Sequence, residues 1–384
     1  MIKKVIFFTI GNSSEMSTWS NIPYLFAKTL EKQNIKIIRI DISQNKLIQR
    51  IFDKIIVPVI GLFYPKHTYT FDRTKICAFI SNRKIRNAVK RNADADLCIF
   101  TTFSFYNKYN NIPNLLFCDW TYDILIKERL GRKPYFFEEW VSKREIEAIT
   151  NSQVIISLFP ECAASMKLSY PTANIHYLGS NVVNTLYFGE FDREEIISKK
   201  TKSNDILFIG GKNYLKGAQK LVNSFMLFSQ KYPDYTLHLI GIQQNWLEKE
   251  FENVYCHGYL KKDEETENAL YYDLLLKARF IINPSLVWAS YSSTIEAMYF
   301  YTPVVITPYK DFVAEFGESI DFGYYVEDFS EAGISEIIER MCKAERYVEM
   351  CKIAHDKVAN YTWDSYVGKI LELANTYIKS RRII

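Results

Sequence analysis

The chain has 384 residues, of which 48% are hydrophobic and 15% are aromatic, a content that excludes an intrinsically disordered protein. With only 14 glycines and 11 prolines, a collagen-like or linker-dominated chain is excluded as well. The formal net charge of +4 is small, so it does not indicate a nucleic-acid-binding protein unless basic residues cluster locally.

Short apolar runs alternate with longer helical patterns along the whole chain. The first series of expected strands covers 5–10, 35–40, 97–101, 115–118, 154–157 and 175–178. The second series covers 206–209, 236–240, 254–257, 280–283 and 304–307. Expected helices between them include 19–32, 138–151, 216–231, 293–299 and 330–343. Continuous apolar strands separated by helices predict parallel sheets that are covered on both faces.

A charge-rich stretch without strand character, 184–204, separates the two series. We therefore predict an α/β protein with two Rossmann-like domains that face a central cleft, where the carboxyl ends of the strands would bind a ligand. The expected division is an N-terminal domain over 1–183, a linker over 184–204 and a C-terminal domain over 205–365. A last helix over 366–384 is expected to pack back on the N-terminal domain.

Cysteine usage and the N-terminal pattern indicate a reducing compartment. The seven cysteines are scattered, and none forms a pair with metal-ligand spacing. No signal-peptide pattern follows Met1, and the longest apolar run, 55–64, is about half as long as a bilayer requires. We therefore expect a cytoplasmic protein.

One helix expected near residue 85 carries a basic cluster: Arg83, Lys84, Arg86, Lys90 and Arg91. It is either a solvated helix face or a patch that contacts an anionic membrane surface, where each basic residue contributes ~1 kcal/mol. Nothing around it resembles a nucleic-acid-binding module, so we expect no nucleic-acid partner.

A glycine pair marks the start of the second series. Gly210 and Gly211 follow a strand, and Lys216 lies at the start of the next helix. Glycines let the backbone approach a ligand, and a lysine at a helix N-terminus adds charge to free N–H groups, which favours an anion site. A plain tight turn with a solvated lysine is the alternative.

The segment 282–306 carries a more specific pattern. Asn283-Pro284-Ser285 ends a strand, Tyr291 to Met298 opens a helix, and Thr302 to Ile306 begins the next strand. This order resembles the nucleotide-sugar site of GT-B glycosyltransferases, in particular the family-4-like group (glycosyl transferases group 1). The segments 239–241, 257–259 and 361–364 fit the same family in order, and the resemblance covers roughly 205–373.

The resemblance implies a donor-binding site in the C-terminal domain. Glu296 would bind the ribose hydroxyls, the loop before it would present N–H groups to the diphosphate, and Lys216 would neutralise that diphosphate. The implied binding set is Gly210, Gly211, Lys216, Gly241, Tyr259, Trp288, Tyr291, Ser292, Ser293, Thr294 and Glu296. For Glu296 the alternative is a capping box with Ser293, because the two residues have that spacing.

This sequence departs from the family pattern at two places. Trp288 stands where the motif has its first glutamate, and the arginine often found ahead of the matching lysine is missing. An indole cannot accept hydrogen bonds from sugar hydroxyls, so we expect a donor with a less polar edge there, such as a deoxy or acetamido sugar.

In the N-terminal half, Asp119 follows a buried strand. The segment resembles the family's D-x-T segment at the cleft, where an aspartate can orient or deprotonate an acceptor hydroxyl. A turn-forming or helix-capping aspartate is the alternative. Asp119 and Lys216 are the two expected catalytic residues.

The resemblance predicts a hexosyltransferase-like enzyme that moves a sugar from a nucleotide sugar to a glycan or lipid-linked acceptor in surface polysaccharide assembly, with retention. The alternatives are an inverting transferase with Asp119 as base and a non-catalytic scaffold that binds a nucleotide. A dehydrogenase is disfavoured, because 11–14 lacks the GxGxxG pattern. No cofactor and no metal are expected, and the basic helix would place the protein at the inner membrane face.

Overall fold

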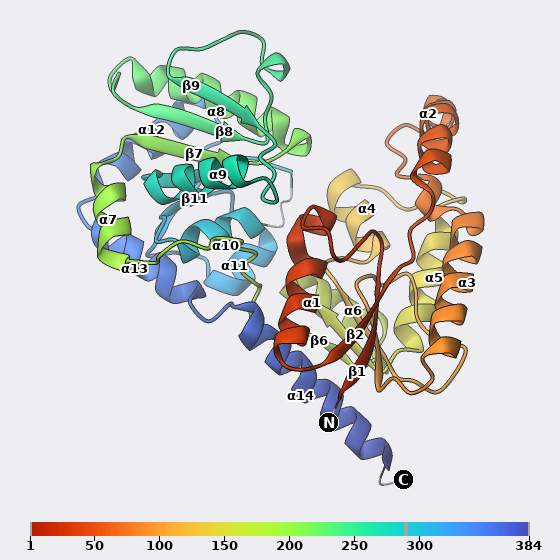
Figure 1. The fold of residues 1–384 in the computed structure, drawn as a ribbon. Coiled ribbons are helices and arrows are strands. Elements are labelled where there is room, and N and C mark those ends of the chain that lie inside the picture. The colour runs from red at the N-terminus through yellow and green to blue at the C-terminus, as the bar shows by residue number, and fades with distance from the viewer. Residues whose placement is uncertain (1, 288–290, 383–384) are drawn as a thin grey trace. The chain divides into compact units, whose positions relative to one another are not determined.

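The computed structural model describes residues 2–287 and 291–382. The chain forms two compact units: Met1–Ser180 together with Trp363–Ile384, and Asn181–Thr362. Each unit contains one six-stranded sheet in which all neighbouring strands are parallel. The predicted α/β class with two Rossmann-like domains is thereby confirmed (Figure 1).

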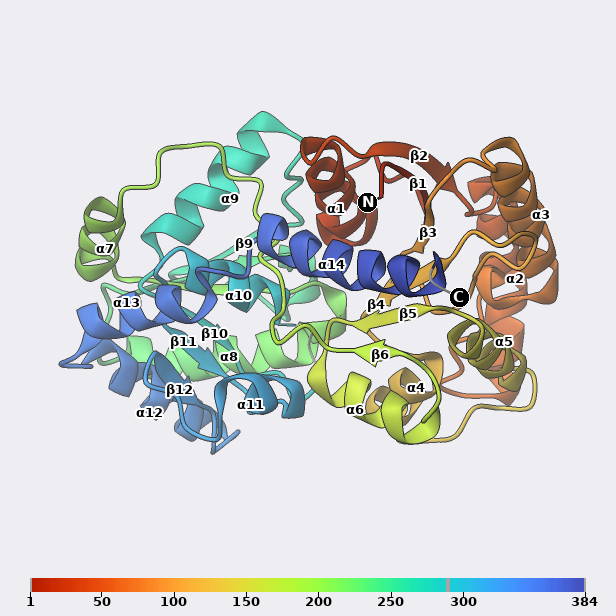
Figure 2. The ribbon, with the colours of Figure 1, turned by 90° about the horizontal axis from the view of Figure 1, so that it is seen from below.

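The first unit has the strand order β2-β1-β3-β4-β5-β6. Its strands are β1 (Lys4–Thr9), β2 (Lys36–Asp41), β3 (Leu97–Phe100), β4 (Asn114–Cys118), β5 (Val154–Ser157) and β6 (Ile175–His176). Its helices are α1 (Ile22–Lys32), α2 (Lys46–Phe63), α3 (Lys75–Arg91), α4 (Tyr122–Leu130), α5 (Glu139–Thr150), α6 (Pro160–Ser169) and α14 (Trp363–Arg382), with the short turns η1 (Thr18–Asn21) and η2 (Phe71–Arg73). Helices cover both faces of this sheet, with α1 and α14 on one face and α3 and α5 on the other (Figures 1 and 2).

The second unit has the strand order β12-β11-β10-β7-β8-β9. Its strands are β7 (Asp205–Ile209), β8 (Thr236–Ile240), β9 (Val254–Gly258), β10 (Phe280–Asn283), β11 (Val304–Ile306) and β12 (Gly323–Tyr325). Its helices are α7 (Arg193–Lys202), α8 (Leu215–Ser229), α9 (Glu265–Lys277), α10 (Ser292–Tyr299), α11 (Lys310–Phe316), α12 (Glu331–Cys342) and α13 (Tyr347–Val358), with the short turns η3 (Lys212–Tyr214) and η4 (Gln244–Trp246). α8 and α12 pack against each other over one face of the sheet.

The central strands are apolar on both faces, which is why they are buried in both units. Phe7 and Phe8 in β1 are fully buried, and so are Ile206 and Phe208 in β7. The side chains of successive residues point to opposite faces of a strand, so burial of both neighbours requires a helix layer on each side. This arrangement leaves the carboxyl ends of the strands and the loops that follow them as the places for polar chemistry.

The C-terminal helix α14 belongs to the first unit. The Trp363 ring stacks on Phe26 of α1 with ring centroids 5.5 Å apart, and the Ile2 N–H donates to the Asn375 side chain at 3.1 Å. After α13 the chain therefore returns from the second unit to the first, and α14 completes the first unit.

The segment 184–204, expected as a linker, contains a helix instead. It lies within the second unit, and α7 accounts for half of it. The ammonium of Lys200 on α7 is fully buried and donates to the Leu275 and Ala278 carbonyls and the Thr302 hydroxyl at 2.7, 3.2 and 2.8 Å. Lys200 is therefore part of the interior of the second unit, although it lies in a charge-rich stretch of the sequence.

Within the described ranges, no helix combines the length and hydropathy needed to cross a bilayer. The same residues contain no group of three or more His, Cys, Asp or Glu side chains arranged to hold a metal ion.

Candidate functional site

Two glycines of the implied binding set, Gly210 and Gly241, lie against each other at the carboxyl ends of β7 and β8. Gly210 N–H donates to the Ile240 carbonyl at 3.0 Å, and Gly241 N–H donates to the Gly258 carbonyl at 2.6 Å. Gly241 has a φ of +89°, and a Cβ there would lie 2.6 Å from the Gly210 oxygen. Only glycine fits this close approach of two backbones.

We expect Gly241→Ala to lower the free energy of unfolding by at least about 1–3 kcal/mol, because the new Cβ meets a carbonyl in a strained backbone region. Gly211→Ala is the matched control, since the space around Gly211 is open and its φ is −84°. Denaturant unfolding of both variants checks this, and equal losses would contradict it.

Lys216 lies in the first turn of α8 and is exposed. Tyr214, the N-cap residue of α8, makes no side-chain capping bond to this helix, and η3 leads into it with the Leu215 N–H donating to the Lys212 carbonyl. The positive end of a helix dipole favours an anion, and the Lys216 ammonium adds a full charge beside it.

The turn after β10 packs directly on the start of α8. A Cβ on Gly217 would lie 2.2 Å from the Ser285 hydroxyl oxygen, so this glycine permits the contact. Tyr309 fixes the turn by donating to the Ser285 carbonyl at 2.6 Å. The buried Ser285 hydroxyl has no hydrogen-bond partner among the described residues. The structure thus brings the glycine pair's helix and the Pro284-Ser285 motif together.

The loop before α10 is held by contacts within the second unit. Tyr291 is the N-cap with a φ of 39°, and its hydroxyl donates to Glu315 at 2.8 Å. The Ser292 hydroxyl accepts from the Asn184 amide at 3.0 Å. Ser293 is half-buried, and Thr294 is buried. Because Tyr291 is the N-cap, Ser293 lies inside the helix, and the capping box proposed for Ser293 and Glu296 is wrong.

Glu296 forms a buried network that the sequence did not predict. Its two carboxylate oxygens both accept from the Lys262 ammonium at 2.7 Å. Tyr271 and Tyr272, neighbours on α9, donate to the same carboxylate at 2.8 and 2.9 Å. Burial raises the pKa of both tyrosines, so they remain protonated donors. Figure 1 shows α9 and α10 in the same part of the second unit.

This network uses the acceptor capacity of Glu296. A carboxylate has about four lone-pair positions, and Lys262, Tyr271 and Tyr272 supply four contacts to it. A ribose hydroxyl would therefore have to replace one of these donors. None of these three donors was identified from the sequence as a partner for Glu296.

The other predicted binding residues are dispersed. Tyr259 is 69% exposed just after β9, close enough to Tyr271 to contribute to the raised pKa of that residue. Trp288 lies outside the described residues. Among the described residues, no contact joins Lys216 to Glu296.

Asp119 lies at the carboxyl end of β4 in the first unit and is half-buried. Its Oδ1 accepts from the Trp120 N–H at 2.8 Å and from the Cys118 thiol at 3.2 Å. The cap of α4 is Thr121, not Asp119, so the helix-capping alternative is wrong. No described residue donates to Asp119 Oδ2, which leaves that oxygen free to accept a hydroxyl.

Glu145 on α5 is a carboxyl group that the sequence analysis did not identify as a candidate site residue. It accepts from the Tyr122 N–H at 2.7 Å and from the Ser104 hydroxyl at 2.9 Å, so it joins the loops after β3 and β4. Burial raises the pKa of Glu145 to about 7. A carboxyl group with such a pKa at the carboxyl edge of a sheet is suited to proton transfer near neutral pH.

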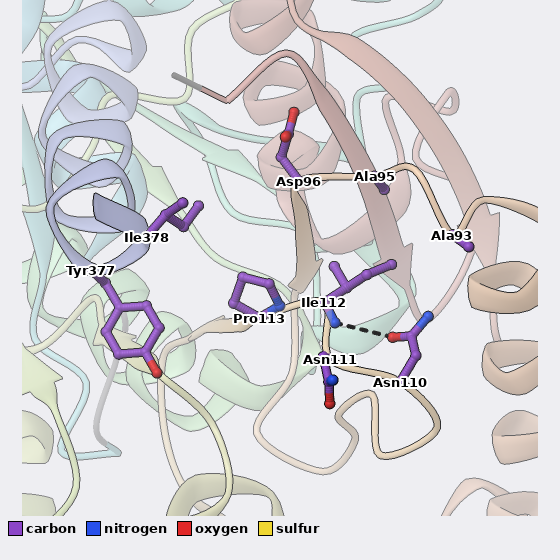
Figure 3. Close-up of a pocket in the computed structure, with 9 residues that line it drawn as sticks. All are labelled: Ala93, Ala95, Asp96, Asn110, Asn111, Ile112, Pro113, Tyr377 and Ile378. Atoms are coloured by element: carbon purple, nitrogen blue, oxygen red, sulfur yellow. Dashed lines mark hydrogen bonds between the residues drawn. The ribbon is translucent and has the colours of Figure 1, made fainter. Parts of the chain in front are cut away.

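A pocket of about 410 Å³ in the first unit lies at the opposite, amino edge of that sheet (Figure 3). It is lined by Ala93, Ala95, Asp96, Asn110, Asn111, Ile112, Pro113, Tyr377 and Ile378. The Asp96 carboxylate already accepts from the Lys3 and Lys4 N–H groups at 2.7 and 3.0 Å. This pocket is thus separate from the sheet edge that carries Asp119.

The family model described as "Glycosyl transferases group 1" matches residues 203–343. The matched segment contains the glycine pair, Lys216, the Ser285 turn and Glu296, and it confirms the resemblance seen in the sequence. No match was found among curated proteins.

Solved structures with the same fold include the following three proteins. S. aureus TarM in complex with fondaparinux, α-GlcNAc-glycerol and UDP is 17% identical over 77% of this chain and 59% of its own, with a TM-score of 0.59. A glycosyltransferase from Rickettsia africae is 15% identical over 98% and 99%, with a TM-score of 0.65. WaaG, a glycosyltransferase involved in lipopolysaccharide biosynthesis, is 14% identical over 96% and 99%, with a TM-score of 0.63.

At these identities the likeness is one of fold, and the chain spans about three fifths of the TarM chain, 59%. The two parallel sheets and these neighbours show a GT-B architecture with two α/β units.

Proposed function

We propose that this protein is a nucleotide-sugar-dependent glycosyltransferase of the hexosyltransferase type. The carrying observation is the start of α8, where the positive end of the helix and the exposed Lys216 lie beside the Gly210–Gly211 turn inside the segment that matches the family. This arrangement stabilises negative charge at one place. Negative charge develops on the diphosphate as the bond to the sugar breaks, so stabilisation there accelerates transfer.

In this proposal the chain's own cationic groups neutralise the leaving diphosphate, and no metal or cofactor is required. Lys216 binds the diphosphate, and the start of α10, Tyr291–Thr294, approaches it with its N–H groups. Gly211 leaves open space in front of the turn, where a Cβ would meet nothing within 4 Å. Glu296 contributes by holding the start of α10 in place through Lys262.

The acceptor is proposed to be a glycan or a lipid-linked saccharide of surface polysaccharide assembly, and the transfer is proposed to retain configuration. Asp119 would orient the acceptor hydroxyl through its unpaired Oδ2. An inverting reaction with Asp119 as general base is the alternative within the same fold, and the neighbouring Glu145 with its raised pKa supplies a second carboxyl group for it.

A non-catalytic nucleotide-binding protein is the second candidate function. The observation that favours it is the occupied carboxylate of Glu296, which has no acceptor position left for a ribose hydroxyl. Turnover of a nucleotide sugar, measured as release of the nucleoside diphosphate with and without a glycan acceptor, separates the two candidates.

We expect Lys216→Ala to weaken binding of UDP or GDP by about 10–100-fold, because one charge-assisted hydrogen bond contributes ~1.5–3 kcal/mol. Binding of the corresponding nucleoside should stay nearly unchanged, since the lysine addresses phosphate. Lys220→Ala, one turn further along α8, is the matched control. Calorimetric titration checks this, and equal losses for nucleoside and diphosphate would exclude the role.

The proposed location is cytoplasmic, with peripheral contact to an anionic membrane through the basic cluster on α3. Arg83, Arg86, Lys90 and Arg91 are exposed there. Lys84 differs from them, because its ammonium donates to the carbonyls of Asp41, at 3.3 Å, and Ser43. Four of the five basic side chains are therefore available to a lipid surface.

A further inference from the structure

Helix α2 presents an unusual surface in the first unit. It has 18 residues, and none of them is buried. Five large apolar side chains are 52–80% exposed at helical spacing: Ile48, Ile51, Ile55, Val59 and Leu62. Figure 1 shows α2 projecting away from the sheet of its unit. Scattered exposed apolar residues are ordinary in proteins, but a contiguous stripe of this kind marks an interaction site.

A mixed side of α2, not its apolar stripe, faces the rest of the unit, and on this side Phe52 lies 5.4 Å from Phe71 between ring centroids. Gln49 donates to the Asp72 carboxylate at 2.9 Å, and Asp53 accepts from the Phe71 N–H at 3.0 Å. His67 contacts the Val57 carbonyl at 3.1 Å. Residues 49, 53 and 57 lie on the helix side opposite to the stripe, because each residue turns the helix by about 100°. The stripe is therefore left exposed, whereas the apolar stripe of an ordinary amphipathic surface helix faces the core.

The stripe borders an apolar hollow of about 270 Å³. The hollow is lined by Ile48, Ile51, Phe52, Ile55, Ile56 and Phe71. It offers no polar side chain that could orient a sugar or a nucleotide, so its chemistry fits hydrocarbon. At the end of the helix, Phe63 and Phe136 are 75% and 72% exposed, and the Phe136 ring lies 6.0 Å from that of Tyr64.

The charges around the stripe are nearly all positive. Lys46, Arg50 and Lys54 of α2 are exposed, and Lys66 follows just beyond its end. The one acidic residue of the helix, Asp53, is held by the Phe71 N–H. A second copy of the same face would place lysine against lysine, whereas an anionic lipid surface accepts both the apolar stripe and the basic rim.

We propose that α2 is a lipid-binding element that lies in the surface of an anionic bilayer, with the stripe and the hollow in contact with acyl chains. The proposal deepens the proposed function by supplying the surface at which a lipid-linked acceptor would be met. Only the statement about the acceptor rests on the proposed function. Vesicle binding and nucleotide binding are measured separately, so either result can be negative without the other.

Co-sedimentation of the full chain with vesicles made of equal parts phosphatidylcholine and phosphatidylglycerol tests the proposal. Ile51→Glu/Ile55→Glu is expected to lower vesicle binding at least about tenfold, because two apolar contacts are lost and two negative charges face the lipid. Leu168→Glu/Phe188→Glu is the matched control. It makes the same change at two apolar residues that are 86% and 83% exposed elsewhere, and it should bind within about twofold of wild type.

The basic cluster on α3 gives a different expected result. Arg83→Gln/Arg86→Gln/Lys90→Gln should weaken binding less at moderate salt, and its effect should disappear as salt screens the charges. If this variant abolishes vesicle binding while Ile51→Glu/Ile55→Glu has no effect, the basic helix and not α2 is the membrane contact, and the proposal is overturned. Calorimetric UDP or GDP binding should be the same for all variants.

A second measurement follows the depth of α2. Leu62→Trp places an indole at a position that is 80% exposed, and its emission, taken as the difference from wild type, should shift to the blue when vesicles are added. Brominated acyl chains should quench it. An unshifted and unquenched emission overturns the proposal. So does a dimeric wild-type protein that Ile51→Glu/Ile55→Glu converts to a monomer, because the stripe would then be an interface between two copies.

Discussion

Lys262→Met is expected to lower the free energy of unfolding of the second unit by about 3–5 kcal/mol, the usual cost of breaking a buried ion pair from one side. Glu296 is 4% exposed at its side chain and Lys262 is 13% exposed, so the remaining carboxylate would be left almost without water. The two tyrosines would still donate to it, but neither carries a positive charge. Denaturant unfolding followed by circular dichroism measures the loss.

Two further variants identify the origin of that loss. Lys277→Met removes an ion pair with Asp273 on the same helix α9, where the two side chains are 50% and 52% exposed. It should cost less than about 1 kcal/mol, as exposed pairs do. Lys262→Met/Glu296→Gln should regain a large part of the stability, because it removes the unpaired charge. A loss for Lys262→Met no larger than that for Lys277→Met would show that the buried pair is not the reason.

The same variants bear on the proposed function. If Glu296 acts by holding α10, Lys262→Met should reduce nucleotide affinity in the molecules that remain folded, although Lys262 itself is not proposed to contact the nucleotide. The start of α10 also depends on the Asn184 amide at Ser292 and on Tyr291 at Glu315. These contacts come from residues far apart in the sequence. The pattern around 291–296 alone could not reveal them, so it left a helix cap and a ribose contact as the two expected roles of Glu296.

Most of the fold was predictable, because a parallel strand buried on both faces appears as a continuous apolar run. All eleven expected strands are present within a few residues of their predicted bounds. The missed strand, β12, has three residues at the edge of its sheet, too few for a periodic signal. Helix α2 was missed as a helix because Pro58 and Gly61 interrupt its apolar run, and that run was weighed only against the length of a bilayer span.

The candidate site was predictable where local backbone chemistry decides the outcome and not where distant side chains meet. Gly210 and Gly241 were chosen separately and lie in contact, because both end adjacent parallel strands. Lys262 and the pair Tyr271–Tyr272 gave no such signal. Their roles depend on α9 crossing beside α10, and no spacing in the sequence encodes that crossing.

Lys200 is a second residue whose role depends on distant contacts. In the sequence it belongs to the charge-rich stretch that was expected to be a linker. Its ammonium is buried without an acidic partner among the described residues and is satisfied by two carbonyls and a hydroxyl. Burial lowers the pKa of Lys200 from its usual value to about 7. Cys351, the nearby thiol, has a pKa that burial raises to about 11, so the thiol stays neutral over most of the range in which the lysine titrates.

The contribution of Lys200 to the free energy of unfolding should therefore rise with pH above pH 7. Between the folded pKa of about 7 and the unfolded value near 10.4, the unfolded chain binds a proton that the folded chain does not. The free energy of unfolding then increases with pH, by ~1.4 kcal/mol per pH unit for one group. Below pH 7 both states are protonated, and the full penalty of burying the charge is present.

The decisive measurement is the difference in unfolding free energy between wild type and Lys200→Met, followed from about pH 7 to about pH 9. Other titrating groups are common to both proteins and largely cancel in this difference. The free energy of unfolding of wild type should increase relative to that of the variant by ~1.4 kcal/mol for each pH unit. The variant itself leaves the Leu275 and Ala278 carbonyls unpaired, a cost that does not depend on pH. A difference that stays constant across this range would mean that Lys200 remains charged in the folded protein, with its three acceptors offsetting the cost of burial.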